Sequence, residues 1–277
     1  MKRLAVIAIL SIICSIAGAQ TAHWITADDP TCNERNVWIE FRKDFDLKKK
    51  VKKAETRIAA DSKYWLYVNG QCVVFEGGLK RGPNPNDTYY DMVDLAPYLR
   101  KGKNEVKFLL WYFGKSGFSH KSSGQSGMIF DSPSIGLVSD SSWLSQRLDA
   151  YRTAGKPVVN YRLSEANILY DARLEGQDGY KPSVELGEWG CKPWNNLILR
   201  PIPQWKDYGI KPLEYTVSND GEGNTILTAR LPYNAQMTPV IDLDAAEEGV
   251  LVKMETDHIM GGSEPCVRAE YITRKGP

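Results

Sequence analysis

The stretch RIAADSKYWLYVNGQCVVF, residues 57–75, decides the fold. It consists of two runs rich in β-branched and aromatic residues, joined by Asn69-Gly70. Asn and Gly tolerate the positive φ angles that both central residues of a type I′ turn require. Because the flanking runs suit a pleated surface, the stretch predicts a β-hairpin that turns at Asn69-Gly70.

Three aromatic residues of this hairpin, Tyr64, Trp65 and Tyr67, lie close in sequence to Asp61 and Asn69. Ring faces combined with short hydrogen-bonding side chains are typical of carbohydrate sites. Buried aromatic residues are also the rule in the core of a β-sandwich, and for any single residue of the three a core position is the favoured interpretation. The hairpin therefore leaves two readings open, a packed core or a surface that contacts sugar.

Strand patterns continue on both sides of the hairpin. Residues 37–45 alternate between two faces, and residues 105–113 form a long β-prone run. Between the hairpin and this run, residues 89–104 indicate a short helical turn or loop that ends in a Gly/Asn reversal. Turn residues separate segments of strand length, and the sequence shows no long amphipathic helix. The pattern predicts an all-β protein, with residues from about Thr21 to Arg152 in an antiparallel β-sandwich.

Two shifts in composition, at residues 153–157 and 211–212, indicate boundaries along the chain. The piece between them is rich in Trp and Pro and has few regular strands, so we expect an extension that packs on its neighbours. The last piece is expected to contain strands at 226–231, 240–243 and 250–255, with a further open strand pattern at 269–273. This pattern is typical of a β-domain that stops before it is complete.

The N-terminus predicts export from the cytoplasm. Lys2 and Arg3 precede an apolar run from Leu4 to Ile16, and Ala17-Gly18-Ala19 supplies small residues for cleavage. The run is too short for a membrane-spanning helix, so residues 1–19 are interpreted as a signal peptide of a periplasmic or extracellular protein. A lipid anchor at Cys14 is disfavoured, because the preceding Ile is larger than the residue such a site requires.

Composition excludes several classes of partner and cofactor. The net charge of +1 gives no reason to expect binding to nucleic acid or to an acidic membrane. The basic run 48–53 lacks interleaved aromatic residues and is interpreted as a solvated loop. The remaining cysteines are too dispersed for a zinc site and too few for a disulfide scaffold, so isolated thiols are expected. These residues are Cys32, Cys72, Cys191 and Cys266. We expect no metal and no cofactor, while structural calcium stays an open question.

Motifs for catalysis are weak. The three histidines, His23, His120 and His258, are dispersed and interpreted as structural. The segment 124–128 resembles a nucleophile elbow, but its second glycine comes one residue early. The glycine-rich segment 77–83 lacks the phosphate-loop pattern. Carboxylates are abundant, and glycoside hydrolysis needs two of them across a sugar, but the sequence does not select a pair. The carboxylates considered are Asp61, Asp91, Asp94, Asp171, Glu175 and Glu188.

Several segments together resemble a known family. Residues 57–70, 82–83, 88–91 and 93–112 resemble the galactose-binding-like jelly-roll domains of bacterial (Bacteroides-type) α-L-rhamnosidases of glycoside hydrolase family 78. The run YDARLE at 170–175 and the run LRPIP at 199–203 are similar to the region that follows these domains, and segments 229–234 and 261–271 resemble the start of the next β-domain. The resemblance implies a galactose-binding-like β-sandwich at 20–155, a rhamnosidase-type linking region at 156–212 and the start of a second β-domain, apparently truncated, at 213–277.

In that family the catalytic acid and base lie in a large (α/α)₆ barrel, and the chain has no comparable helical periodicity. The resemblance therefore implies a non-catalytic portion of an exported enzyme, with no catalytic residue in this chain. Its implied partners are rhamnose-containing glycans and the missing C-terminal catalytic domain. Two alternatives stay open, namely a structural docking module without a sugar site and a stand-alone lectin-like protein. The candidate carbohydrate-binding residues are Asp61, Trp65, Asn69, Arg81, Tyr89 and Trp111.

Overall fold

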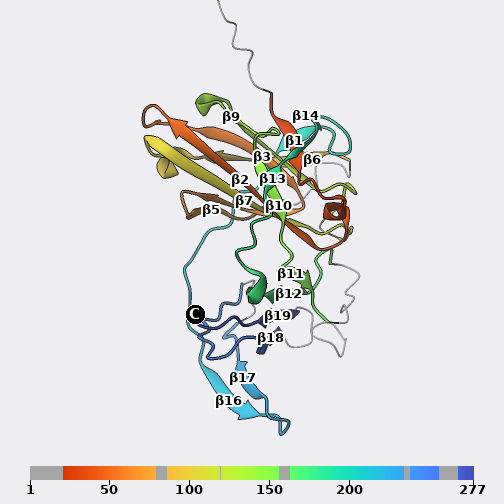
Figure 1. Ribbon diagram of the computed structural model, residues 1–277, viewed down its shortest axis with the longest axis vertical. Coiled ribbons are helices and arrows are strands. Elements are labelled where there is room, and N and C mark those ends of the chain that lie inside the picture. The colour runs from red at the N-terminus through yellow and green to blue at the C-terminus, as the bar shows by residue number, and fades with distance from the viewer. Residues whose placement is uncertain (1–20, 79–85, 119, 156–162, 234–237, 256–267) are drawn as a thin grey trace, which may run out of the picture.

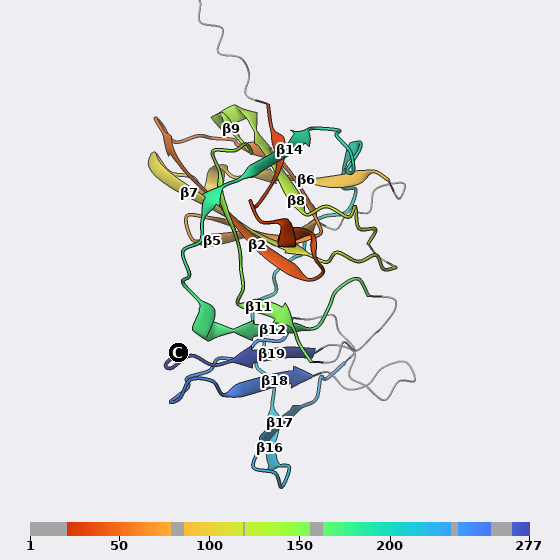
Figure 2. The same cartoon turned by 45° about the vertical axis from the view of Figure 1, so that its right-hand side comes forward.

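The computed structural model describes residues 21–78, 86–118, 120–155, 163–233, 238–255 and 268–277. Two large sheets form a β-sandwich, and a four-stranded sheet lies below it in Figure 1. A two-stranded hairpin extends from that small sheet, away from the sandwich, in both views (Figures 1 and 2). The all-β fold expected from the sequence is confirmed. None of the helices in the described ranges is long and apolar enough to cross a bilayer.

The first sheet of the sandwich contains seven strands. In spatial order they are β14 (Val184–Glu188), β1 (His23–Thr26), β8 (Gly127–Ser132), β3 (Glu55–Asp61), β6 (Thr88–Asp94) and β15 (Leu197–Leu199), with β9 (Leu137–Val138) paired to β8. The pairs within this sheet are antiparallel except for β15, which runs parallel to β6. Both outer strands therefore come from the predicted linking region.

The second sheet of the sandwich contains six strands, and all its pairs are antiparallel. In spatial order they are β13 (Lys181–Pro182), β10 (Leu144–Arg147), β2 (Val37–Leu47), β7 (Gly102–Tyr112), β4 (Lys63–Val68) and β5 (Gln71–Gly78). Burial alternates strictly along β4, as expected for a strand with one face on the core and one face outward.

The lower part of the molecule contains two smaller sheets. One consists of β11 (Tyr151–Thr153), β12 (Ile168–Asp171), β19 (Arg268–Ile272) and β18 (Leu251–Glu255), and the other of β16 (Tyr215–Asn219) and β17 (Thr225–Ala229). The helices are short 3₁₀ turns: η1 (Pro30–Asn33), η2 (Ala96–Tyr98), η3 (Pro133–Ile135) and η4 (Ala172–Leu174).

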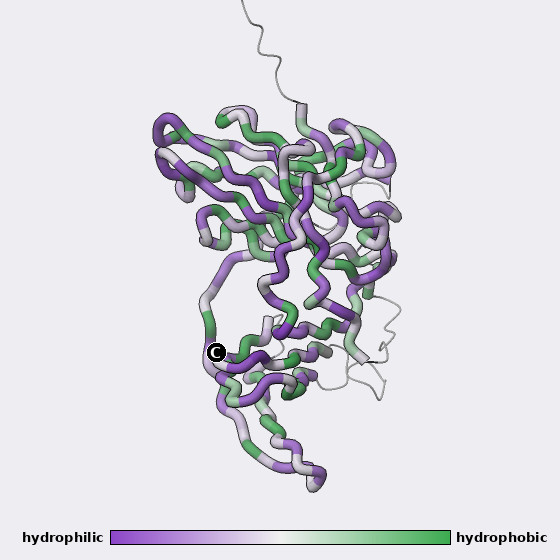
Figure 3. The backbone as a smooth tube through the Cα atoms, in the orientation of Figure 1, coloured by the Kyte–Doolittle hydropathy of each residue, from purple (hydrophilic) through white to green (hydrophobic). Residues whose placement is uncertain are grey.

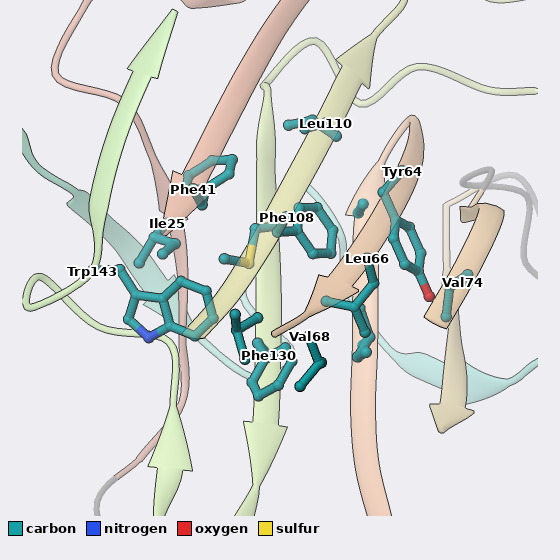
Figure 4. Packing of buried hydrophobic residues seen from close by; sticks show 14 of the residues in the cluster. Ile25, Phe41, Tyr64, Leu66, Val68, Val74, Phe108, Leu110, Phe130 and Trp143 are labelled. Carbon is teal, nitrogen blue, oxygen red and sulfur yellow. The ribbon is translucent and has the colours of Figure 1, made fainter. Parts of the chain in front are cut away.

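The main hydrophobic core lies between the two large sheets. Figure 3 shows hydrophobic and hydrophilic positions mixed along the strands of the upper part, and Figure 4 shows the packing of the buried hydrophobic residues at close range. The inward face of β4 contributes Tyr64, Leu66 and Val68, all fully buried. Tyr64 stacks on Phe108 of β7 with ring centroids 4.7 Å apart. The predicted core reading of the hairpin aromatics is thus correct for Tyr64, whereas Trp65 and Tyr67 face outward and are half-buried.

The hairpin that the sequence predicts is present. Strands β4 and β5 are joined at Asn69-Gly70, where φ is 51° and 80°, so both residues adopt the left-handed conformation of a type I′ turn. The Asn69 side chain donates to the Tyr98 carbonyl and to Asn104 Oδ1, both at 2.9 Å, and its own Oδ1 accepts from the backbone N–H of Glu105 at 3.1 Å. These bonds fix the tip of the hairpin against the start of β7.

Two local predictions need correction. Residues 88–94 form strand β6, followed by the short turn η2, instead of belonging to a turn or loop throughout. The first half of this segment, 88–90, pairs with β15 and the second half, 91–94, pairs with β3, and this long-range pairing overrides the local turn pattern. Residues 240–243 form no strand, although the strands expected around 226–231, 250–255 and 269–273 are present as β17, β18 and β19.

Candidate functional site

The carboxylate of Asp61 lies in the interior at the end of β3. It is fully buried, and its Oδ2 accepts from the backbone N–H of Ser123 at 2.9 Å. Its Oδ1 accepts from the Ser62 hydroxyl at 2.9 Å and lies 3.3 Å from His120 Nε2. Asp61 therefore connects strand β3 to the long loop between β7 and β8, and its side chain has no surface from which to meet a sugar.

The combination of Ser62, His120 and Asp61 contains the residue types of a hydrolytic triad, but its geometry differs. Both the Ser62 hydroxyl and the Asp61 carboxylate approach the same imidazole nitrogen, Nε2, at 3.2 Å and 3.3 Å. A Ser-His-Asp relay uses the two different nitrogens of the ring. Because all three side chains are buried as well, the cluster braces the interior and does not form a catalytic site.

Trp111 and Trp65 are the two candidate residues that the structure brings together. Both lie on the outer face of the second sheet, and each stacks on Trp38, with centroid distances of 4.8 Å and 5.3 Å. Trp111 is buried and donates its indole N–H to Asn36 Oδ1 at 2.7 Å. Tyr151 of β11 stacks on Trp38 at 4.1 Å. The aromatic cluster of Trp38, Trp65, Trp111 and Tyr151 therefore joins the sandwich to the four-stranded sheet. Trp65 lies at the edge of this cluster and is half-buried.

The other candidates lie elsewhere. Asn69 is at the hairpin tip, where its side chain holds the turn. Tyr89 is a half-buried residue of β6 in the opposite sheet, paired with Ile198. Arg81 falls outside the described residues. The five candidates in the described part of the chain thus do not converge on one surface, and the role of all six in binding stays a prediction.

Sequence reasoning missed a buried ion pair between the linking region and the sandwich. Arg200 Nε lies 2.6 Å from Asp91 Oδ1, and the two side chains are 13% and 1% exposed. Asp91 Oδ2 accepts from the Tyr64 hydroxyl at 2.7 Å, while Arg200 also donates to the Gly78 carbonyl. Burial, together with the charge of Asp91, raises the pKa of Tyr64 well above its ordinary value. In the sequence, the only indication of this ion pair is Arg200 within the otherwise uncharged LRPIP run.

A shallow depression opens where β6 and β15 begin. Its polar groups pair with one another: the Asn195 amide donates to the Asn86 carbonyl at 2.6 Å, and Asp87 Oδ1 accepts from the backbone N–H of Asn196 at 3.3 Å. It is lined by Asn86, Asp87, Lys192, Pro193, Asn195 and Asn196. No aromatic ring is in this lining, so the depression offers no stacking surface for a ligand.

The described part of the chain contains no group of three or more His, Cys, Asp or Glu side chains that could hold a metal ion. Its three cysteines are free thiols, and Cys266 lies outside it. Burial raises the pKa of Cys32 to about 12, so this thiol stays protonated and packs as a small apolar residue.

Residues 201–233 are exposed without interruption. They include many large hydrophobic side chains, among them Ile202, Trp205, Tyr208, Ile210, Leu213, Tyr215, Val217, Ile226, Leu227, Leu231 and Tyr233. The chain leaves the sandwich after Arg200, runs down beside it and forms the β16–β17 hairpin (Figure 1). We call residues 201–233 the exposed arm.

The hairpin of the exposed arm is amphipathic. The register pairs Tyr215 with Ala229 and Val217 with Leu227, so these residues share one face, while Thr216 and Thr228 face the other way. The exposed fractions of Tyr215, Val217 and Leu227 are 62%, 63% and 52%. An isolated two-stranded hairpin is marginally stable in water, and an apolar face of this kind is usually covered.

Comparison with solved structures identifies proteins with a similar architecture. A family 78 rhamnosidase of Bacillus sp. GL1 matches 68% of this chain with 29% sequence identity and a TM-score of 0.56. The chain is similar to family 78 α-L-rhamnosidases. The α-L-rhamnosidases of Dictyoglomus thermophilum and Aspergillus terreus match 92% and 91% of the chain, each with 17% identity, at TM-scores of 0.56 and 0.59. These two show the fold alone.

The resemblance to rhamnosidase β-domains that the sequence predicts is thereby confirmed. The chain spans 20% of the Bacillus enzyme and 31% of each of the other two. No protein-family model matches the chain, and neither does any curated protein.

Proposed function

We propose that this chain is a non-catalytic, β-rich portion of an exported α-L-rhamnosidase-like glycoside hydrolase, and that it supports the catalytic domain. The observation that carries the proposal is the apolar face of the β16–β17 hairpin, which is exposed in the chain by itself. The similarity to rhamnosidases that are about three times as long supports a catalytic domain as the occupant. Export rests on the N-terminal sequence pattern.

The exposed arm begins directly after a residue that is bound in the sandwich. Its first residue follows Arg200, which is bound in the sandwich through Asp91 and Gly78. The strand before it, β15, pairs with β6. A domain docked on the arm would therefore be connected to the sandwich through the anchored residue Arg200.

Hydrogen exchange provides the test, with the longer protein encoded at the same locus as the comparison. In the isolated chain we expect the amides of residues 215–219 to exchange rapidly, because the hairpin lacks cover on both faces. In the longer protein the same amides should be protected by at least about tenfold. A locus that encodes no helical catalytic domain, or equal exchange in both proteins, contradicts the proposal.

A pair of variants on one strand separates docking from general stability. In the longer protein, Val217→Lys places a charge on the apolar face and should raise the rate of exchange of the hairpin. Thr216→Lys is the matched control, because it adds the same charge on the opposite face of β16. If the two variants behave alike, the apolar face is not the docking surface.

The proposal also predicts that the polypeptide by itself does not hydrolyse an aryl α-L-rhamnoside. The family resemblance implies that the acid and base lie in a helical domain, and the Ser62-His120-Asp61 cluster is buried and wrongly arranged for catalysis. The assay is chromophore release by the purified chain. Release above that of a mock preparation would overturn this prediction.

A further inference from the structure

A β-bulge lies opposite Trp65 on the outer face of the second sheet. Tyr64 of β4 pairs with Gly77 of β5, but Leu66 pairs with Val74, so Phe75 and Glu76 together oppose the single residue Trp65. A bulge of this kind redirects side chains out of the regular alternation. Glu76 has φ of 54°, which a residue with a Cβ adopts at a cost in conformational energy.

The bulge places both of its side chains beside the outer face of β4. The Phe75 ring meets the Trp65 indole edge to face, with centroids 6.2 Å apart, and Phe75 is 46% exposed. One face of Trp65 is covered by Trp38, which stacks on it. The half-buried Trp65 and the exposed Phe75 therefore form an apolar corner at the surface, at the margin of the aromatic cluster.

Charged groups surround the same corner. Lys63 Nζ lies 3.5 Å from Glu76 Oε2, 3.9 Å from Glu165 Oε1 and 5.5 Å from the centroid of the Trp111 ring. The three charged side chains are 14%, 25% and 27% exposed, so each is largely but not completely withdrawn from water.

The hydrogen-bonding capacity of this corner is incompletely used. Glu165 Oε2 is buried without a hydrogen-bond partner, and so is the hydroxyl of the neighbouring Ser164, a residue that is 2% exposed. Buried polar atoms in proteins nearly always have a partner, and those without one point to a missing donor or acceptor.

We propose that Trp65, Phe75, Lys63, Glu76 and Glu165 form a contact site for one neutral pyranose unit of a glycan. The apolar ring face of the sugar would lie in the corner between Trp65 and Phe75. Its hydroxyls would donate to the two carboxylates and accept from Lys63. Two carboxylates against one ammonium disfavour an acidic sugar. The site goes beyond the proposed support function, which requires the exposed arm and no ligand.

The site differs from the one that the sequence predicts. Trp65 is common to both, whereas Asp61 and Trp111 are buried and Asn69 and Tyr89 lie at other surfaces. Phe75 and Glu76 reach the site because of the bulge, and Glu165 reaches it from a segment almost ninety residues further along the chain.

NMR titration of the whole chain tests the site. The probes are methyl α-L-rhamnopyranoside and methyl β-D-glucopyranoside, with D-galacturonate as the acidic comparison. Small exposed sites bind single sugars weakly, so we expect saturable shifts of the Trp65 indole signal with a Kd on the order of 1–10 mM for at least one neutral probe. Galacturonate should bind more weakly than that probe.

Three variants locate the binding. Phe75→Ala removes the exposed wall, and Glu76→Gly removes a carboxylate while suiting the positive φ, so it should not unfold the bulge. Each should weaken binding by about tenfold, since a contact of this kind contributes on the order of one power of ten in affinity. Phe118→Ala is the control, because Phe118 is also exposed, at 60%, and lies outside the site. Thermal unfolding of each variant establishes that it is folded.

The proposal is overturned if no neutral probe causes saturable shifts up to about 50 mM, a concentration at which a 10 mM site is more than half occupied. It is equally overturned if both site variants bind like the unmodified chain, or if galacturonate binds more tightly than the neutral probes. None of these results bears on the hairpin and its exchange, so failure here leaves the support function intact.

Discussion

The sandwich and the exposed arm are both built from β-prone sequence, but they differ in what their apolar side chains meet. In the sandwich the inward side chains of β4 and β7 are buried in the core between the two sheets. In the exposed arm the corresponding side chains of β16 and β17 point into solvent. Alternation of apolar and polar residues therefore indicates which face will be buried, and the partner that buries it has to be found separately.

The difference follows from the number of layers. A sheet gains stability when a second layer covers its apolar face, and the sandwich supplies two such layers. The β16–β17 hairpin is a single layer of two strands. Since burial of apolar surface is the main favourable contribution to folding, the arm contributes little to the stability of the chain by itself.

Truncating one aromatic side chain in each region should give the largest contrast. Phe108→Ala removes a fully buried ring that stacks on Tyr64 and should cost about 3–5 kcal/mol of unfolding free energy. Tyr208→Ala removes a ring that is 73% exposed and should change stability by less than about 0.5 kcal/mol. Urea denaturation of both variants measures the contrast. Similar losses would mean that the arm is packed in solution.

Removing the anchor between the two regions comes next in size. Arg200→Ala leaves the Asp91 carboxylate buried without its cation and should cost about 3 kcal/mol. Arg173→Ala is a suitable control: Arg173, the partner of Asp171, is 45% exposed, so this substitution should cost clearly less than Arg200→Ala. The measurement is the midpoint of chemical unfolding. Equal costs would show that the buried pair is no more important than the half-exposed one.

The hairpin turn gives a smaller effect. Asn69→Ala removes three hydrogen bonds and forces a Cβ residue without a polar side chain into positive φ, so we expect a loss of about 2 kcal/mol. Asn69→Gly loses the same bonds but accepts the φ angle, and should cost about 1 kcal/mol less. The two midpoints measured side by side separate conformational strain from hydrogen bonding. No difference between them would rule out strain as a contribution.

The sequence was most informative where structure depends on neighbours along the chain. The Asn-Gly turn and the strands around it follow from local propensity and from the φ angles that these two residues tolerate. The alternation along residues 37–45 likewise indicates one buried face and one outer face, and the structure has strand β2 there.

It was least informative where distant residues meet. Asp61 belongs to an aromatic, polar stretch typical of a sugar site, but its burial is produced by Ser123 and His120, some sixty residues away. The partner of Asp91 is 109 residues further along the chain. The bulge at Glu76 depends on how β5 pairs with β4 at the edge of a sheet, and the residue types in the segment do not predict it.

The smallest predicted effect is a dependence on pH in the four-stranded sheet, which lies between the two regions compared above. Asp171 accepts two side-chain hydrogen bonds from Arg173, each 2.8 Å long, and these bonds lower the pKa of the Asp171 carboxyl below its ordinary value. A carboxyl whose pKa is lower in the folded state stabilises the fold at pH values above its unfolded pKa of about 3.9. This stabilisation is lost as the pH falls through the folded pKa. Because Arg173 is 45% exposed, solvent screening limits this stabilisation to less than about 1 kcal/mol.

Asp171→Asn should therefore be less stable than the unmodified chain at pH 7 by up to this amount, and the difference should vanish near pH 2. Urea unfolding at both pH values measures it. A difference that persists at pH 2 would mean that the asparagine disturbs the cap of η4 and that charge is not the cause.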